Sequence, residues 1–171
     1  MRLNAPAGIR VVKKEDKEEN LRAFVEQRLA ILAAHNAEAP TAGLTISLIA
    51  RSLESPAVRA LAHLAEPLER AGIHLAAIIV DPPQPAEADR AALFKTLRVV
   101  KDPRFLEAHE QLVIDGTTAW IGDCMRREPS KRDAYERFAT DCADTAAWAQ
   151  RAYDRLLLRA GPAAAHQAMY S

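Results

Sequence analysis

The residues whose types could do chemistry gather in one stretch, Phe105 to Arg127, which reads FLEAHEQLVIDGTTAWIGDCMRR. His109 supplies an imidazole, which can act as a nucleophile or a proton donor near neutral pH. Gln111 supplies an amide that donates hydrogen bonds, and Asp115 supplies a carboxylate. These three polar residues stand where the core of a plain strand would be apolar, and we take them as the candidate catalytic residues.

A β-hairpin is expected to position these side chains. Leu112–Ile114 are β-formers that lead into Asp115-Gly116, a dipeptide that tolerates positive φ in tight hairpin turns. The segment 117–121 then resumes β-type chemistry, and Gly122 ends it.

Residues of equal parity share one face of a strand. His109, Gln111, Val113 and Asp115 are therefore expected to point one way, and Glu110 the other.

Four further residues are candidate ligand-binding residues. Asp81 directly follows an apolar segment at its carboxyl end, where ligands gather in open α/β sheets. The alternative is a plain loop start, since two prolines follow Asp81. Asp123 comes directly after Gly122. Arg126 and Arg127 begin a basic cluster that could supply positive charge, with a solvated loop as the alternative.

A strand–helix–strand unit precedes the hairpin. Apolar segments at 44–50 and 73–80 flank a helix that begins at Ser55-Pro56, with a hydroxyl cap and a proline at its first position. Pro67 is expected to kink its last turn. Such a crossover predicts parallel strands in one sheet. An amphipathic helix is expected at 15–35, and its start lies in a charge run at 13–20 that is interpreted as solvated. The other expected elements are a short helix at 86–95, a strand at 97–100, an edge strand at 135–140 and a last helix to 159.

Composition narrows the class of protein. The 171 residues include 23 Lys and Arg and 23 Asp and Glu, so no overall charge attracts nucleic acid or an anionic membrane. Two cysteines, Cys124 and Cys142, form no disulfide framework and are expected to be free thiols. No secretory signal and no apolar run of membrane-spanning length is recognised. We therefore expect a cytoplasmic protein without a membrane span.

The chain is expected to be one domain over 1–171, with a core at 44–160 and flexible ends at 1–12 and 162–171. Trp120 and Trp148 are both expected to fill the core. No His, Cys, Asp or Glu spacing suggests a metal, and no glycine-rich loop suggests a nucleotide, so no metal and no cofactor is expected.

The order of elements over 44–160 resembles one half of a phospholipase D superfamily fold. The hairpin HEQLVIDGTTAWIGDCM resembles the family's signature, which is His, any residue, Lys, four residues, Asp, six residues, and Gly-Ser-any-Asn. Asp115 and Gly122 fit that spacing. Counting back from Asp115 places Ala108 and Glu110 where His and Lys belong, and His109 and Gln111 stand one residue away.

The resemblance implies an α/β fold with a mixed, mostly parallel sheet flanked by helices, and an extra N-terminal helix. In the family, two sites meet, two histidines act on phosphorus, and two lysines hold the phosphate oxygens. A chain with one hairpin copy is therefore expected to form a homodimer, with a phosphate-containing ligand as the expected partner. In a monomer, an apolar strip on the hairpin faces would be exposed to water.

Three functions remain open on these residues. The first is a non-catalytic phospholipase-D-like domain with a binding or scaffolding role. The second is a metal-independent phosphodiesterase that uses His109 across a homodimer axis. The third is an unrelated α/β ligand-binding domain in which Asp81 and His109 meet at a cleft.

Overall fold

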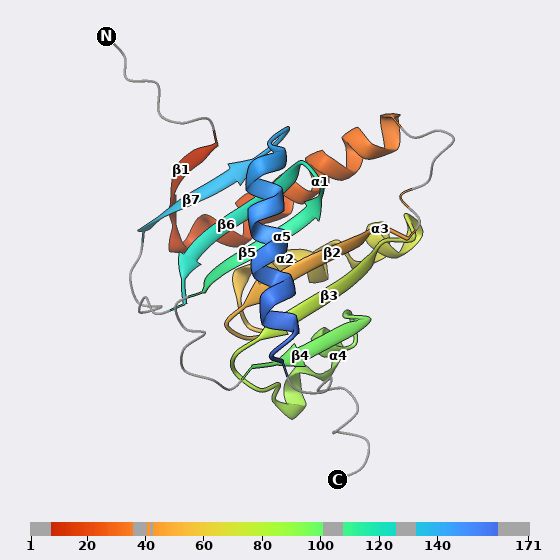
Figure 1. Ribbon diagram of the computed structural model, residues 1–171. Coiled ribbons are helices and arrows are strands. Elements are labelled where there is room, and N and C mark those ends of the chain that lie inside the picture. The colour runs from red at the N-terminus through yellow and green to blue at the C-terminus, as the bar shows by residue number, and fades with distance from the viewer. Residues whose placement is uncertain (1–7, 36–40, 42, 101–107, 126–132, 161–171) are drawn as a thin grey trace.

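All strands of the computed structural model belong to one mixed sheet. The structure describes residues 8–35, 41, 43–100, 108–125 and 133–160. The seven strands in this part of the chain lie in the order β1-β7-β6-β5-β2-β3-β4, and helices cover both faces (Figure 1). This confirms the α/β class with a mixed sheet flanked by helices.

Half of the sheet is parallel. Its strands are β2 (Thr45–Ala50), β3 (His74–Ile79) and β4 (Thr96–Val99). β3 pairs in parallel with β2 on one side and β4 on the other. The connections carry the helices α2 (Pro56–His63), α3 (Ala65–Arg70) and α4 (Ala88–Ala91), and the short 3-10 helix η2 (Pro85–Glu87).

The first crossover holds two helices where one kinked helix was expected. The break falls at Leu64, whose φ of −102° and ψ of 9° leave the helical region. Pro67 explains the position of the break, because proline has no backbone N–H to donate four residues back, to His63. The chain therefore restarts as α3 one residue after α2 ends.

The other half of the sheet is antiparallel. Its strands are β5 (His109–Asp115), β6 (Thr118–Cys124), β7 (Asp133–Ala139) and β1 (Ile9–Lys13). Parallel pairing was expected to predominate, but it is confined to β2, β3 and β4. The consecutive strands β5, β6 and β7 pair antiparallel, as hairpin-type neighbours do, and the long-range pairs β2·β5 and β1·β7 are antiparallel as well.

Strand β7 is not the edge strand that its alternating sequence suggested. Residues 9–13 pair with its outer side and form the edge as β1, within and just after the stretch 1–12 that was expected to be a flexible end or a short edge segment.

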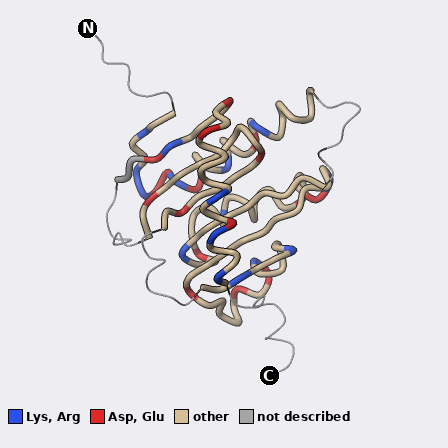
Figure 2. The backbone as a smooth tube through the Cα atoms, in the orientation of Figure 1, with Lys and Arg blue, Asp and Glu red and all other residues tan. Residues whose placement is uncertain are grey.

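Two helical layers cover the sheet. On one face lie α1 (Lys17–His35), preceded by the 3-10 helix η1 (Lys14–Asp16), and also α2 and α3. On the other face α5 (Ala143–Leu157) crosses the strands, and basic and acidic residues alternate along its solvent side (Figures 1 and 2). Each helical layer packs apolar side chains against its own face of the sheet, so the central strands β2 and β5 are covered on both faces.

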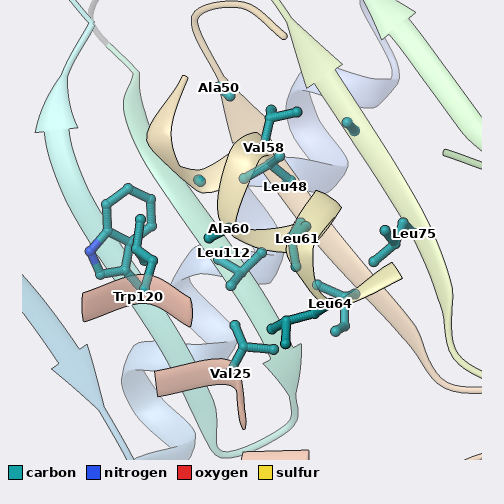
Figure 3. Packing of buried hydrophobic residues seen from close by; sticks show 14 of the residues in the cluster. Val25, Leu48, Ala50, Val58, Ala60, Leu61, Leu64, Leu75, Leu112 and Trp120 are labelled. Atoms are coloured by element: carbon teal, nitrogen blue, oxygen red, sulfur yellow. The ribbon is translucent and has the colours of Figure 1, made fainter. Parts of the chain in front are cut away.

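The larger cluster lies under α1 and α2. Val25 of α1, Leu61 of α2 and Leu112 of β5 meet there beside the ring of Trp120 (Figure 3). Trp120 is 2% exposed, as expected for a core residue. Trp148 of α5 was expected in the core as well, but it is 43% exposed.

The strip of apolar hairpin residues expected on the surface is buried inside the single chain. Leu112, Ile114 and Trp120 pack under α1 and α2, and Val113 packs under α5. The hairpin turn also differs from expectation. Gly116 does not adopt a positive φ, and the Asp115 carboxylate instead accepts the Thr117 N–H at 2.9 Å. Such an Asx-type contact stabilises a turn without left-handed backbone.

Gly122 lies inside β6, whereas the sequence suggested that it ends the strand. A Cβ atom at this position would lie 2.3 Å from the six-membered ring of Trp120, two residues earlier on the same face. The absence of a side chain at Gly122 is therefore what lets the indole lie flat over β6.

We predict that Gly122→Ala lowers the free energy of unfolding by about 1–3 kcal/mol, because a rigid buried ring must move to admit the methyl group. Urea denaturation followed by far-ultraviolet circular dichroism measures this change. Gly116→Ala is the matched control, since an added Cβ there meets nothing within 4 Å, and its effect is expected within about 0.5 kcal/mol. Equal effects of the two substitutions would contradict the packing argument.

Candidate functional site

Strand β5 divides its polar side chains between the two faces of the sheet. Glu110 points to the face covered by α1 and α2, where it contacts the start of α2. His109 and Gln111 point to the α5 face, as parity predicted. Each face has its own hollow next to β5, so the candidate residues are separated between two sites.

The first hollow, which we call the Glu110 cleft, has a volume of about 610 Å³. It opens where β2 ends and α2 begins, next to η1 and the end of β6. Its charged lining residues are the basic Lys14, Lys17, Arg51 and Arg59 and the acidic Glu15, Glu18, Glu54, Glu110 and Asp123. Ser52, Ser55, Pro56, Cys124 and Met125 complete it. Five carboxylates against four cations leave this cleft without an excess of positive charge.

Glu110 is fixed by backbone and hydroxyl donors. Its Oε1 accepts the Arg51 N–H at 2.9 Å and the Ser55 hydroxyl at 3.0 Å. Ser55 precedes the first residue of α2, and its Oγ also accepts the Ser52 N–H at 3.2 Å. A carboxylate at a helix start is stabilised by the unpaired N–H groups there. The Glu110 side chain therefore fills a position at the start of α2 that would also suit a bound anion.

A buried ion network closes one end of the cleft. The Lys17 Nζ lies 2.6 Å from Oδ2 of Asp123 and 3.4 Å from Oε1 of Glu136. Glu136 has no exposed side-chain surface, and its Oε2 accepts the indole N–H of Trp120 at 3.1 Å. The network joins α1, β6 and β7, and it already engages the positive charge of Lys17.

Burial sets the protonation of this network. Desolvation raises the pKa of Glu136 above its ordinary value of 4.5, and it outweighs the attraction of Lys17 and the Trp120 hydrogen bond. Desolvation alone would lower the pKa of Lys17, but the hydrogen bond to Asp123 and the charge of Glu136 raise it above 10.5. Lys17 thus remains a cation across the neutral range.

The second hollow, which we call the Trp148 groove, has a volume of about 560 Å³ and lies between β5 and α5. Its lining residues are Ile49, Ala108, His109, Gln111, Trp148, Ala152, Arg155, Leu156, Leu158 and Arg159. Gln111 is 1% exposed, and its side-chain amide donates to the carbonyl of Ala149 at 2.6 Å. Gln111 therefore anchors α5 to the sheet.

His109 lines the Trp148 groove. Its Nδ1 lies 3.0 Å from the carbonyl oxygen of Gly122, and because a carbonyl only accepts, Nδ1 carries the hydrogen. The ring stands edge-on to Trp148, with centroids 6.5 Å apart. His109 and Gln111 are thus brought together, as the sequence suggested.

Asp115 does not join them. A β-bulge shifts the register between Val113 and Asp115, which turns Asp115 toward α1 and overturns the parity expected for it. There it lies 2.7 Å from Nε of Arg28. Burial raises the pKa of Asp115, but the Thr117 N–H and the Arg28 guanidinium outweigh it and hold the pKa below 3.8.

The remaining candidate residues do not lie together in the structure. Asp123 lines the Glu110 cleft, as a ligand-binding role requires. Asp81 is exposed, donates its backbone N–H to the Arg51 carbonyl at 2.8 Å, and lines neither hollow. It does not meet His109 at a cleft. Arg126 and Arg127 lie outside the described residues.

Two residues of the Glu110 cleft were not singled out as functional from the sequence. The sequence places the Glu110 carboxylate at the spacing of the family lysine, but no role was proposed for it. The same spacing could have predicted that Glu110 faces the cleft. Lys17 belongs to a charge run interpreted as solvated, yet its side chain is only 12% exposed. Nothing in the run itself distinguishes Lys17, because its partners are more than 100 residues away.

The described residues contain no group of three or more His, Cys, Asp and Glu side chains arranged to hold a metal ion. Cys124 and Cys142 do not form a disulfide, as expected. None of the helices in the described ranges has the length and hydropathy needed to cross a bilayer.

Comparison with known proteins identifies solved structures with a similar fold. No protein-family model matches the chain, and no curated protein matches its sequence. Two solved structures similar to it are Nuc from Salmonella typhimurium, a phospholipase D family member, and NucT from Helicobacter pylori. Nuc has 12% identity and a TM-score of 0.55, over 90% of this chain and 96% of that chain. NucT has 13% identity and a TM-score of 0.56, over 90% and 98%.

A third similar structure is that of TrmBL2, an archaeal chromatin protein with a novel mode of DNA binding. It has 12% identity and a TM-score of 0.54 over 94% of this chain, which spans 56% of that chain.

The chain therefore has a phospholipase-D-like α/β fold. This confirms the fold that the order of elements and the hairpin predicted. At this level of identity the likeness concerns the fold alone, so the function has to be argued from the site.

We predict that Lys17→Met lowers the free energy of unfolding by about 3 kcal/mol at pH 8, because it leaves a buried carboxylate uncompensated. A raised pKa means that folded Glu136 binds its proton more tightly than the unfolded chain does. The cost of the ionised form therefore grows as pH rises above about 4.5, and the deficit is expected to shrink at pH 5. Urea denaturation at the two pH values measures both effects.

Lys14→Met is the matched control, because Lys14 is an exposed lysine at the rim of the same cleft. It removes the same charge and is expected to change stability by less than about 0.5 kcal/mol at either pH. A Lys17→Met deficit that is equal at pH 5 and pH 8 would contradict the assigned role of Glu136.

Proposed function

We propose that this chain is a non-catalytic phospholipase-D-like domain whose role is to bind a ligand at the Glu110 cleft. The observation that carries the proposal is the placement of Glu110. It stands at the signature spacing of the phosphate-holding lysine, and its carboxylate is fixed by the Arg51 N–H and the Ser55 hydroxyl. A fixed negative charge there opposes the charge that accumulates on a transferring phosphoryl group.

The rest of the cleft supports the same proposal. Lys17 is held by Asp123 and Glu136, and Arg59 lies 2.9 Å from Glu18. These two cations are paired with carboxylates of the chain, and acidic residues outnumber basic ones in the lining, so the cleft suits a ligand that donates hydrogen bonds rather than an anion. A phosphate-containing ligand, which the family resemblance implies, is disfavoured in this cleft by the same charges.

The charge of the chain argues against nucleic acid as the ligand. TrmBL2 binds DNA, but this chain has 23 basic and 23 acidic residues, and those that the structure describes are interspersed over the fold (Figure 2). A nucleic-acid surface needs an excess of positive charge to displace counterions from phosphates.

The second candidate is a phosphodiesterase that uses His109. It is favoured by the hydrogen bond from Nδ1 to the Gly122 carbonyl, which fixes the ring and leaves Nε2 unprotonated in the neutral imidazole, as a nucleophile requires. Against it, Gln111 beside His109 is buried and engaged by α5, so no cation takes the place of the family lysine from that position.

We predict no hydrolysis of a bis-aryl phosphodiester or of single-stranded DNA above the buffer rate, without added metal. Gln111→Lys is expected to recover no turnover and to destabilise the fold, because it places an ammonium group at a buried position. Release of the aryl alcohol, followed by absorbance, measures the first reaction.

His109→Ala and His74→Ala form the matched pair for this assay, since His74 is an exposed histidine at the start of β3. Robust wild-type turnover that disappears in His109→Ala and persists in His74→Ala would overturn the non-catalytic proposal and establish the hydrolase.

We also predict a homodimer at micromolar concentration, since the chain carries one copy of a hairpin that the family uses in pairs. The expected result is a mass of about twice 18.8 kDa by sedimentation equilibrium. Because the hairpin faces are buried within one chain, the contact must use other surfaces. A monomer mass at this concentration contradicts the expectation.

A further inference from the structure

The Trp148 groove differs from the Glu110 cleft in charge. Among the described residues that line it, none is an aspartate or glutamate, whereas His109, Arg155 and Arg159 all border it. Ile49, Ala152 and Leu156 contribute apolar surface to it. An apolar floor with basic groups at its edge complements a molecule that is apolar on one side and anionic on the other.

Helix α5 places these groups on one side of the groove. Trp148, Ala152 and Arg155 follow one another at spacings of four and three, so they form a single stripe along α5, and Arg159 follows in the turn after the helix ends. The stripe lies beside the buried residues of α5, such as Ala149 and Leu156, that pack on the sheet. The indole and the guanidinium groups therefore border the same hollow.

Trp148 is the aromatic side chain of this stripe. It is 43% exposed, whereas Trp120 is 2% exposed, and Leu158 at the end of the groove is 88% exposed. A tryptophan buries more apolar surface than any other side chain, so exposure at this level leaves a flat apolar surface uncovered. Such a surface suits stacking against a planar ligand.

His109 presents an oriented imidazole to the same groove. Because Nδ1 donates to the Gly122 carbonyl and the ring edge rests near Trp148, the imidazole is held from two sides. The other ring nitrogen, Nε2, is left for a ligand, and it donates to an oxyanion when the ring carries a hydrogen on both nitrogens. This arrangement offers an oxyanion a hydrogen-bond donor in addition to Arg155.

We infer that the Trp148 groove binds a small organic oxyanion with a flat apolar body, stacked on Trp148 with its anionic group between His109 and Arg155. A volume of about 560 Å³ fits a ligand of this size. The site lies on the opposite face of the sheet from the Glu110 cleft, so the inference stands independently of the proposed function. The anionic group is a carboxylate or a phosphate, which share this recognition chemistry.

The experiment is isothermal titration calorimetry of the full chain at low salt with three naphthalene probes. Naphthalene-1-carboxylate and 1-naphthyl phosphate test the two anionic groups, and 1-naphthylmethylammonium carries the opposite charge on the same body. Saturable binding of at least one anion, with a dissociation constant below about 1 mM, is expected, and no saturable binding of the cation.

Matched variants locate the binding. Arg155→Gln is expected to weaken anion binding about fivefold or more, through loss of one charge-assisted hydrogen bond. Arg151→Gln removes the same charge from an exposed position one turn away on α5 that does not line the groove, and is expected to leave binding within twofold. Trp148→Ala is expected to abolish measurable binding.

Three results would overturn the inference. They are the absence of saturable anion binding to the wild type, equal affinity for the ammonium probe, and equal weakening by Arg151→Gln and Arg155→Gln. Thermal melts followed by circular dichroism verify that each variant is folded. A change of oligomeric mass in Trp148→Ala, without anion binding by the wild type, assigns the groove to a second copy of the chain and likewise overturns the inference.

Discussion

A carboxylate without any exposed surface ties the antiparallel half of this sheet to its first helix. Glu136 of β7 accepts the indole N–H of Trp120 on β6 and lies 3.4 Å from the ammonium group of Lys17 on α1. A buried charge is costly unless its partners are held in place. The indole can reach Glu136 only because Gly122 leaves room for the ring. The packing of Trp120, the position of α1 and the closed end of the Glu110 cleft therefore depend on one another.

The central strand β5 separates two environments of different charge. Helices α1 and α2 cover one face and α5 covers the other, and each pair of layers leaves a hollow beside β5. Alternation along the strand sends Glu110 to one hollow and His109 to the other. Residues that stand next to each other in the sequence therefore border hollows of different charge.

The fold and the chemistry of the site have separate physical requirements. The fold resembles Nuc and NucT at 12% and 13% identity, because apolar residues at the right period and compatible turns suffice to rebuild the same layers. A phosphoryl-transfer site needs particular charges at particular atoms. The Glu110 carboxylate, held by the Arg51 N–H and the Ser55 hydroxyl, is compatible with the fold and incompatible with that chemistry.

Local patterns in the sequence determined the elements and their order. The apolar segments around Ile46 and Ile78, the Ser55-Pro56 helix start and the Asp115-Gly116 turn predicted β2, β3, α2 and the hairpin, because strand alternation, helix capping and turn formation involve neighbours in the chain. The same alternation predicted that His109 and Gln111 share a face.

Only the tertiary structure decided the partners. Lys17 reads as a solvated lysine until Asp123 and Glu136 come to lie beside it, and Trp148 reads as a core residue until α5 turns it outward. Asp115 left its predicted face because a bulge adds one residue to β5, and no local pattern encodes the register of a neighbouring strand. These outcomes depend on contacts between residues far apart in the chain, which form only when the layers pack.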